Sequence, residues 1–230
     1  MMLRMVCVLS TVVLAVGTHA QKIGQQPLQT SHIESAGGLE AHNVLVEPVT
    51  YRGRKALRVA DKAATGAGDA VRLAVVQGTS LEDGTIEVML SGDVLPGVSP
   101  DARGFVGVAF RVSNDASSYE CFYLRPTNGR AEDQLRRNHS AQYISIPGYE
   151  WYTLREKTPG KYESYVDLVP GEWTKVRIKF SGKDAQLYIN GAEQPALVVH
   201  DLKQPVKAGA VALWVGTGTV AHFADLKLSR

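Results

Sequence analysis

Short segments in which apolar and polar residues alternate dominate this chain, with Gly, Pro, Asn and Asp between them. In Gly84–Ser91, Ile86, Val88 and Leu90 face one way and the residues between them face the other. The segment Thr174–Phe180 alternates in the same way between apolar residues and Lys or Arg. Successive side chains of a strand point to opposite faces, so this pattern is typical of antiparallel sheets that are wet on one side. No stretch of useful length carries a 3.6-residue apolar period, and the sequence therefore predicts an all-β sandwich or barrel.

The turn signals divide the chain into a regular series of expected strands. These are Asn43–Val49, Lys55–Ala60, Ala70–Val76, Gly84–Ser91, Gly104–Val112, Tyr119–Arg125, Ala141–Ile146, Tyr162–Val169, Thr174–Phe180, Ala185–Asn190, Ala208–Val215 and Ala221–Leu228. The residues SGKD at 181–184 predict a tight hairpin between two of them. No compositional break or linker interrupts the series, so we expect one domain over residues 42–230.

The first twenty residues are expected to be a signal peptide outside this fold. Arg4 gives a short basic region, Met5 to Val16 is apolar, and Thr18-His19-Ala20 approximates a small-x-small cleavage site. The apolar run is shorter than the roughly 20 residues that span a bilayer, and a strand, an anchor or a lipoprotein fits it less well. Cleavage near Gln21 leaves a polar leader at 21–41 and predicts a secreted product, extracellular or periplasmic.

Composition narrows the classes of partner. The formal charge of +2 becomes about +1 once Arg4 is removed, which is no signature of nucleic-acid or membrane binding. Cleavage also removes Cys7 and leaves Cys121, for which a buried, inert thiol is the expected state. We therefore expect a product that its hydrophobic core, and no internal disulfide, holds together.

The central strands carry an unusual outer face. If they share a sheet, the expected core-facing residues are Val106, Val108, Phe110, Val112, Phe122, Leu124, Ile144, Ile146, Val166 and Leu168. The expected outward residues are Gly107, Ala109, Arg111, Tyr119, Cys121, Tyr123, Arg125, Tyr143, Ser145, Glu163, Tyr165 and Asp167. A solvated face would favour Lys, Glu and Thr, whereas this one combines a small-residue floor with tyrosines, arginines and carboxylates. The pattern predicts a groove.

Between Tyr119 and Trp151 the groove has the side chains that a sugar polymer needs: rings for stacking and planar polar groups for hydroxyls. The candidate ligand-binding residues are Arg111, Tyr119, Tyr123, Arg125, Arg136, Asn138, Gln142, Tyr143, Trp151 and Tyr165. Because Arg presents a donor fork that suits carboxylates or sulfates, an acidic glycan such as a uronan is one candidate. The alternative is that the arginines pair with Glu120, Glu132, Asp133 and Glu150 and lock the loop.

The segment Gly171–Gly191, GEWTKVRIKFSGKDAQLYING, resembles a hallmark of the concanavalin A-like lectin/glucanase superfamily, in particular its laminin-G-like jelly rolls. The segments Gly84–Ser91 and Gly209–Leu228 resemble the opening and closing strands of the same domains, which include bacterial 3-keto-disaccharide hydrolase-like ones. The resemblance implies an antiparallel two-sheet jelly roll that binds glycans across a concave face. The E-x-D-x-x-E-type strand of its β-glucan hydrolases does not occur here, so the resemblance supports the fold better than catalysis.

Two reactions are open alternatives to binding alone. A lyase would need a base, for which His139 or Tyr143 is the candidate, and a group that neutralises a uronate, such as Arg125 or Arg136 with Gln142. A hydrolase would need two carboxylates, and the candidates are Glu120, Asp133, Glu150, Glu163 and Asp167. The pair on one strand face, Glu163 and Asp167, would be about 13 Å apart, beyond the usual separation of about 5 to 9.5 Å.

No cofactor is predicted, because the histidines are scattered and no metal-binding spacing occurs. A loop calcium at residues 128–133 is a weak alternative to an ordinary turn. The leading hypothesis is thus a secreted polysaccharide-recognition module. A glycan-cleaving enzyme on the same face is the second hypothesis, and a structural or protein-interaction domain is the third.

Overall fold

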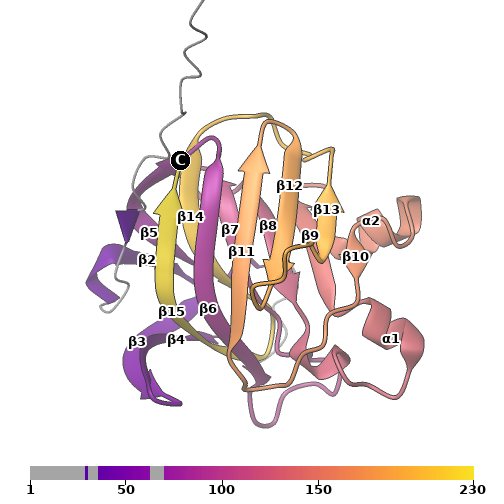
Figure 1. The fold of residues 1–230 in the computed structure, drawn as a ribbon. Coiled ribbons are helices and arrows are strands. Elements are labelled where there is room, and N and C mark those ends of the chain that lie inside the picture. Colours follow the sequence, from indigo (N-terminus) through magenta and orange to yellow (C-terminus); the bar gives the residue numbers. More distant parts are fainter. Residues whose placement is uncertain (1–28, 31–35, 63–69) are drawn as a thin grey trace, which may run out of the picture.

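Two antiparallel sheets packed face to face make up the fold (Figure 1). The structure is a computed structural model that describes residues 29–30, 36–62 and 70–230. The expected signal peptide and most of the expected leader lie outside these residues. All strand pairs in the described residues are antiparallel. The architecture confirms the predicted all-β jelly-roll sandwich.

Sheet A lies in front in Figure 1 and sheet B lies behind it. In order across sheet A, the strands are β13 (Leu197–Val199), β12 (Asp184–Ile189), β11 (Thr174–Ser181), β6 (Gly84–Val94), β15 (Thr219–Ser229), β4 (Arg54–Asp61) and β3 (Val44–Tyr51), with β1 (Gln29–Thr30) beside β15. Across sheet B they are β10 (Glu163–Ser164), β9 (Ala141–Ile146), β8 (Tyr119–Leu124), β7 (Val106–Val112), β14 (Gly209–Val215), β5 (Leu73–Leu81) and β2 (Leu39–His42). The helical segments are η1 (Ala36–Gly38), η2 (Pro126–Asn128), α1 (Gln134–Asn138) and α2 (Trp151–Lys157).

The core lies between the sheets and is filled by the predicted inward faces of several strands. Ile86, Val88 and Leu90 of β6 are buried there, as the alternation predicts. Phe110 of sheet B meets Phe180 of sheet A with ring centroids 4.5 Å apart. Each fully buried side chain of this size contributes about 1.5–3 kcal/mol, and these contacts therefore fix how the two sheets face each other.

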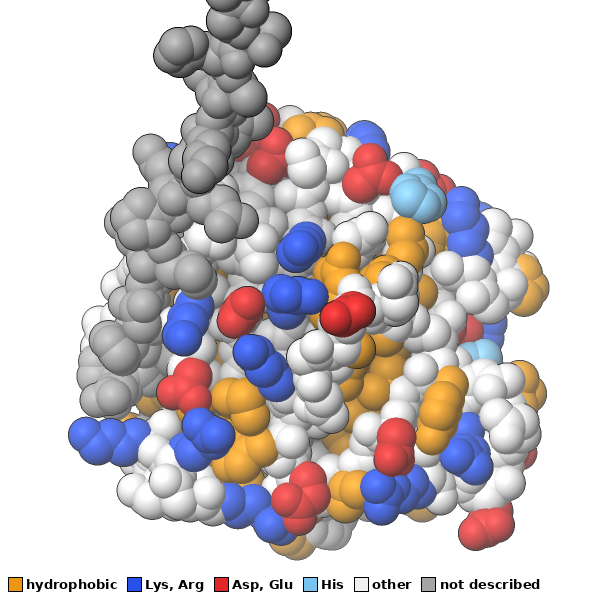
Figure 2. Space-filling model, in the orientation of Figure 1, with side chains coloured by type: hydrophobic (Ala, Val, Ile, Leu, Met, Phe, Trp, Pro, Cys, Tyr) orange, Lys and Arg blue, Asp and Glu red, His pale blue; other side chains and the backbone are white. Residues whose placement is uncertain are grey.

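The outer face of sheet A is solvated, also as predicted. Figure 2 shows Lys, Arg, Asp and Glu side chains interspersed over it. Lys175 lies 3.8 Å from Glu87, and the guanidinium of Arg177 stacks over Tyr188 at 4.2 Å. Charges of both signs thus alternate with polar groups on this face, as on an ordinary solvated surface.

Several elements differ from the sequence-based expectation. Only Glu163–Ser164 of the segment expected at 162–169 forms a strand, although Val166 and Leu168 still face the core. The Ser140 hydroxyl explains the difference, because it accepts the N–H of Val166 at 2.6 Å and donates to its carbonyl at 3.0 Å in place of a strand ladder. The strands β1, β2 and β13 and both α-helices were not predicted, and β1 and all of β2 except His42 lie within the expected leader.

A β-bulge at Arg111 reverses the predicted faces at the end of β7. Arg111 has a left-handed φ of 53°, and the pairing of β7 with β14 shifts at this point. An extra residue turns the following side chains over. Arg111 therefore points between the sheets, where it donates to the Glu82 carbonyl at 2.7 Å, and Val112 joins the outer face. The predictions of Arg111 as a groove residue and of Val112 as a core residue are wrong.

The faces of β9 are likewise the reverse of those predicted. Tyr143 lies opposite Phe122, and Ile144 lies opposite Cys121. Directly opposed residues share a face, so Tyr143 enters the core while Ile144 and Ile146 join the outer face. Alternation alone placed the two isoleucines in the core because it did not anticipate that the outer face of sheet B is apolar as well.

Candidate functional site

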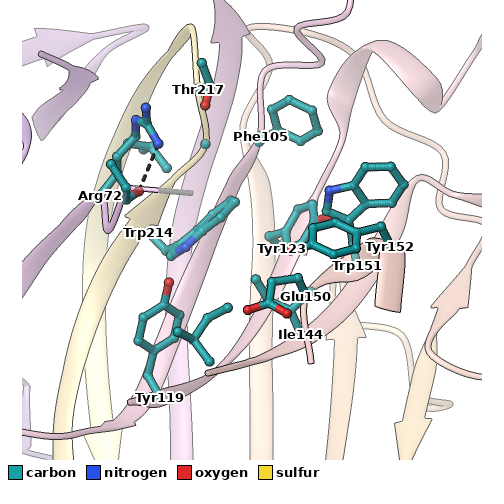
Figure 3. Close-up of a pocket in the computed structure, with 14 residues that line it drawn as sticks. Arg72, Phe105, Tyr119, Tyr123, Ile144, Glu150, Trp151, Tyr152, Trp214 and Thr217 are labelled. Atoms are coloured by element: carbon teal, nitrogen blue, oxygen red, sulfur yellow. Dashed lines mark hydrogen bonds between the residues drawn. The ribbon is translucent and has the colours of Figure 1, made fainter. Parts of the chain in front are cut away.

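A pocket on the outer face of sheet B gathers most of the exposed and buried rings of that face and is a candidate site (Figure 3). Its volume is about 270 Å³. Six aromatic side chains surround it, together with Ile144, Arg72 and Glu150; the rings are Phe105, Tyr119, Tyr123, Trp151, Tyr152 and Trp214. We call it the aromatic pocket.

Gly107 allows the two central rings of the aromatic pocket to meet. It lies between Trp214 of β14 and Tyr123 of β8 in the strand register. A Cβ at position 107 would lie 2.5 Å from the Cβ of Tyr123 and closer still to the carbonyl oxygen of Phe122. Because the glycine has no side chain, the rings of Tyr123 and Trp214 stack across it with centroids 4.7 Å apart. The predicted small-residue floor is therefore present and carries an aromatic layer.

The α2 helix supplies the wall of the pocket. Trp151 and Tyr152 stand at its first turn, in edge-to-face contact at 5.7 Å. Both remain well exposed, at 43 % and 45 %. Figure 3 shows both residues among those that line the pocket with Tyr123 and Phe105. Exposed rings beside a buried aromatic layer provide the surface on which a flat apolar ligand face can stack.

The charged residues in the described lining of the pocket are Arg72 and Glu150. Arg72 pairs with the buried carboxylate of Asp61 at 2.9 Å, and their charges offset each other. Glu150 accepts the N–H of Gly148 at 3.1 Å and is the carboxylate among the described lining residues. Burial raises the pKa of Tyr123 to about 12 and also raises the pKa of Tyr119. Both phenols are therefore neutral at physiological pH and can donate as well as accept hydrogen bonds.

The predicted arginines do not line this pocket but hold the protein together. Arg125 is buried and donates to the Tyr123 hydroxyl at 2.7 Å, to Gln142 Oε1 at 3.1 Å and to the His139 carbonyl at 2.7 Å. Arg136 donates to the side chains of Asn128 and Thr127 at 2.9 and 3.2 Å. Gln142 faces the same side as Tyr123 but is fully covered. Arg125 and Arg136 thus bond to the protein, but not through the predicted pairs with Glu120, Glu132, Asp133 and Glu150.

Glu120 and Tyr143 also lie away from the pocket, in the interior. The Tyr143 hydroxyl donates to Glu120 Oε2 at 2.6 Å and accepts the N–H of Lys203 at 3.1 Å. The N–H of Gln204 donates to Glu120 Oε1 at 2.9 Å. The two side chains thus anchor the segment around residue 203 to the core, which corrects their assignment to the groove.

A second hollow lies between α1 and α2, and we call it the α1–α2 pocket. Its volume is about 620 Å³, and it is lined by Leu135, Asn138, His139, Arg155, Pro159, Gly160, Glu163, Ser164 and Tyr165. It therefore gathers Asn138, His139, Glu163 and Tyr165 from the predicted set, none of which lines the aromatic pocket. The single predicted groove is two separate pockets.

Glu163 is the electrostatic centre of the α1–α2 pocket. Its buried carboxylate binds the guanidinium of Arg155 through two nitrogens and lies 2.9 Å from His139 Nδ1 and 3.7 Å from Arg125. Burial lowers the pKa of His139, and Glu163 opposes that effect. The imidazole is therefore neutral at physiological pH. Asp167 is engaged elsewhere, by both nitrogens of the Arg130 fork at 2.7 and 3.0 Å, so it does not act with Glu163.

Two oxygens of the segment at which a loop calcium was expected bond to the protein. Asn128 Oδ1 accepts from Arg136 Nε at 2.9 Å, and Asp133 Oδ1 caps α1 by accepting the N–H of Arg136 at 2.7 Å. The calcium site stays a prediction. Within the described residues, no group of three or more His, Cys, Asp or Glu is placed to hold a metal ion.

Sequence reasoning found Tyr119, Tyr123 and Trp151 but missed much of the pocket. The missed lining residues include Phe105, Tyr152, Trp214 and Arg72. Trp214 could have been found, since it alternates with Ala210 and Ala212 in a strand whose position was predicted. Reading the faces of that strand would have placed a tryptophan above two small residues on the ligand side.

Comparisons with known proteins support the fold. No protein family and no curated protein matches this chain. Among solved structures, the carbohydrate binding module CBM66 from Bacillus subtilis aligns with a TM-score of 0.56 and 13 % identity over 84 % of this chain and 96 % of that one. A Bacillus subtilis protein with a galectin-like fold aligns with a TM-score of 0.60 and 9 % identity over 90 % and 97 %. Domain 4 of AbnA, an extracellular arabinanase from Geobacillus stearothermophilus, in complex with arabinotriose, aligns with a TM-score of 0.50 and 11 % identity over 90 % and 94 %. These likenesses confirm the two-sheet antiparallel jelly-roll fold.

Proposed function

We propose that this protein recognises a neutral glycan by stacking a sugar ring in the aromatic pocket. The observation that carries the proposal is the ring of six aromatic side chains around a hollow of about 270 Å³. The apolar face of a sugar is flat and buries well against such rings, each of which offers a large contact area at low entropic cost. The likeness in fold to a carbohydrate binding module and to a domain bound to arabinotriose supports the same reading.

The charges favour a neutral sugar over the acidic glycan that the arginines first suggested. Arg125 is committed to protein partners, and Arg72 is paired with Asp61. Of the two charged residues in the described lining, Arg72 is thus paired and Glu150 is a carboxylate, which disfavours a uronate. The Tyr123 hydroxyl already accepts from Arg125 at 2.7 Å, which leaves its own O–H as the group that suits a sugar oxygen.

Export is part of the proposal. The basic Arg4, the apolar run to Val16 and the small-residue site before Gln21 support cleavage and secretion. Within the described residues, no helix is long and apolar enough to cross a membrane. A secreted recognition module would meet its polysaccharide outside the cytoplasm.

Glycan cleavage is the second candidate function, and the position of His139 beside Glu163 in the α1–α2 pocket favours it. The imidazole Nδ1 of His139 lies 2.9 Å from the buried Glu163 carboxylate, and the residue lines a pocket. A neutral, oriented imidazole can accept a proton from a substrate. Cleavage would then use the α1–α2 pocket, next to the site of recognition.

Both functions can be tested in one experiment on the mature protein. It is mixed with neutral polysaccharides (arabinan, fructan and β-glucan) and with acidic ones (alginate and pectate), and retention, new reducing ends and unsaturated uronate are measured together. We expect retention on at least one neutral polysaccharide, and Trp214→Ala to weaken it by about 2 kcal/mol, or about 30-fold. Trp173→Ala is the matched control, because Trp173 packs on Tyr51, outside the pocket. Equal binding by the wild type and Trp214→Ala would refute the assignment, and new reducing ends would select cleavage.

A further inference from the structure

Exposed apolar side chains gather around the two helices. Leu135 (67 % exposed) lies on α1, Trp151 and Tyr152 lie on α2, and Tyr165 (43 %) follows β10. Apart from these four, only Leu45 and Val206 are large exposed hydrophobic residues in the part of the chain that the structure describes. Apolar groups that cluster in this way mark a binding surface. This one extends beyond the aromatic pocket, because Leu135 and Tyr165 line the α1–α2 pocket.

One face of α2 joins the two pockets. Trp151 lines the aromatic pocket, and Arg155 lines the α1–α2 pocket. Residues four apart lie on the same face of a helix, about 6 Å apart along its axis. The guanidinium carbon of Arg155 lies 4.8 Å from the centre of the Trp151 indole ring. The two pockets therefore adjoin across a single aromatic–cation contact.

The lining of the α1–α2 pocket is fixed in place without a ligand. The side chain of Glu163 is 3 % exposed, and its Oε2 accepts a hydrogen bond from Arg155 Nε at 3.1 Å. Arg137 donates to the Tyr165 hydroxyl at 3.1 Å and stacks over its ring at 5.1 Å. A fixed, half-exposed tyrosine ring beside charged and imidazole groups combines a stacking platform with hydrogen-bonding groups.

We propose that the α1–α2 pocket is a second sugar-binding subsite, so that one neutral glycan chain runs from the aromatic pocket over Trp151 to Tyr165. This inference rests on the proposed function of the aromatic pocket. The mixed lining suits another part of a sugar chain better than a protein partner, which would need a larger apolar face. The volume of about 620 Å³ exceeds that of the aromatic pocket, so the subsite has room for more than one sugar ring.

The test measures affinity against chain length by isothermal titration calorimetry, with arabino-, fructo- and cello-oligosaccharides of two to six units. In the series that binds, we expect wild-type affinity to rise with length. Tyr165→Ala should leave the affinity for the shortest binding member unchanged and lower that for the longest about tenfold. Tyr165→Phe keeps the ring and loses the hydrogen bond to Arg137. This variant should retain most of the rise in affinity with chain length. Leu45→Ala, at an exposed site on β3, is the surface control.

Trp214→Ala separates the two claims. We expect it to weaken every length of chain, because it removes a ring from the aromatic pocket. If Trp214→Ala weakens binding but Tyr165→Ala changes no length, the second subsite is refuted and the proposed function stands. If Tyr165→Ala weakens every length and Trp214→Ala none, the α1–α2 pocket is the primary site and both proposals are wrong. Failure of all three series to bind, or affinity that does not rise with length, also overturns the subsite.

Discussion

Replacing Tyr143 with Phe should destabilise the protein and leave ligand recognition intact. The substitution removes the hydroxyl that donates to Glu120 Oε2 at 2.6 Å and accepts the N–H of Lys203 at 3.1 Å. Glu120 is completely buried, so water cannot replace the lost partner. A hydrogen bond to a charged group is worth about 1.5–3 kcal/mol and a neutral one about 1 kcal/mol. We therefore expect the free energy of unfolding to fall by about 3 kcal/mol.

For a domain of this length, about 3 kcal/mol corresponds to a decrease in Tm of roughly 6–12 °C. Circular dichroism on heating would measure it at neutral pH, with the guanidinium midpoint as a second measure. Tyr188→Phe is the matched control, because its hydroxyl donates only to the side chain of Gln186, at 2.6 Å, on the solvated face of sheet A. An unchanged Tm together with lost glycan binding would refute the reasoning, and it would return Tyr143 to the binding face on which alternation placed it.

Three further outcomes follow from the same packing. Gly107→Val should lower the free energy of unfolding by about 3 kcal/mol or more, because a Cβ at position 107 would lie 2.5 Å from the Cβ of Tyr123. A Tm equal to that of the wild type would contradict this. Arg111→Met should leave glycan affinity unchanged, since Arg111 points between the sheets, and a measured loss of affinity would place it in the site. Burial lowers the pKa of the half-buried His222 to about 4, so the unfolded state takes up a proton first as pH falls from about 6.5 to 4. The free energy of unfolding should therefore fall by about 1–2 kcal/mol across this window, after allowance for solvent screening. Urea denaturation at several pH values would measure this fall, and the fall should be absent in His222→Phe.

Strand positions could be predicted because turn residues mark the strand ends and burial sets the alternation. The segment Ala141–Ile146 was predicted with its observed bounds, and the inward faces of β6, β8 and β11 are also confirmed. The bulge at Arg111 could not be predicted, because a left-handed φ at a residue other than glycine leaves no mark in an alternating pattern. A single inserted residue was enough to exchange the faces of two side chains.

The site was harder to predict than the fold because its polar side chains had several possible partners. The sequence places Arg125 beside Tyr123 on one strand face, and the structure confirms that they share it. An alternating pattern does not show whether a guanidinium is available to a ligand or is hydrogen-bonded to the protein. Here its donors reach Tyr123, Gln142 and the His139 carbonyl. The short α2, which supplies Trp151 and Tyr152, has too few residues for a helical period to show.

The two sheets differ in a way that bears on how the aromatic pocket would work. The strand β11 alternates between buried and exposed residues, whereas every residue of β7 and β8 is buried. Sheet B therefore has apolar contacts on both faces, and its outer face is covered by its own rings, such as Tyr123 stacked on Trp214. Rings that already pack on one another lose little rotamer freedom when a sugar is added. The apolar outer face is the reason that alternation placed Ile144 in the core. The same apolar packing makes this face a preorganised surface, on which a stacked ligand would add to contacts already formed.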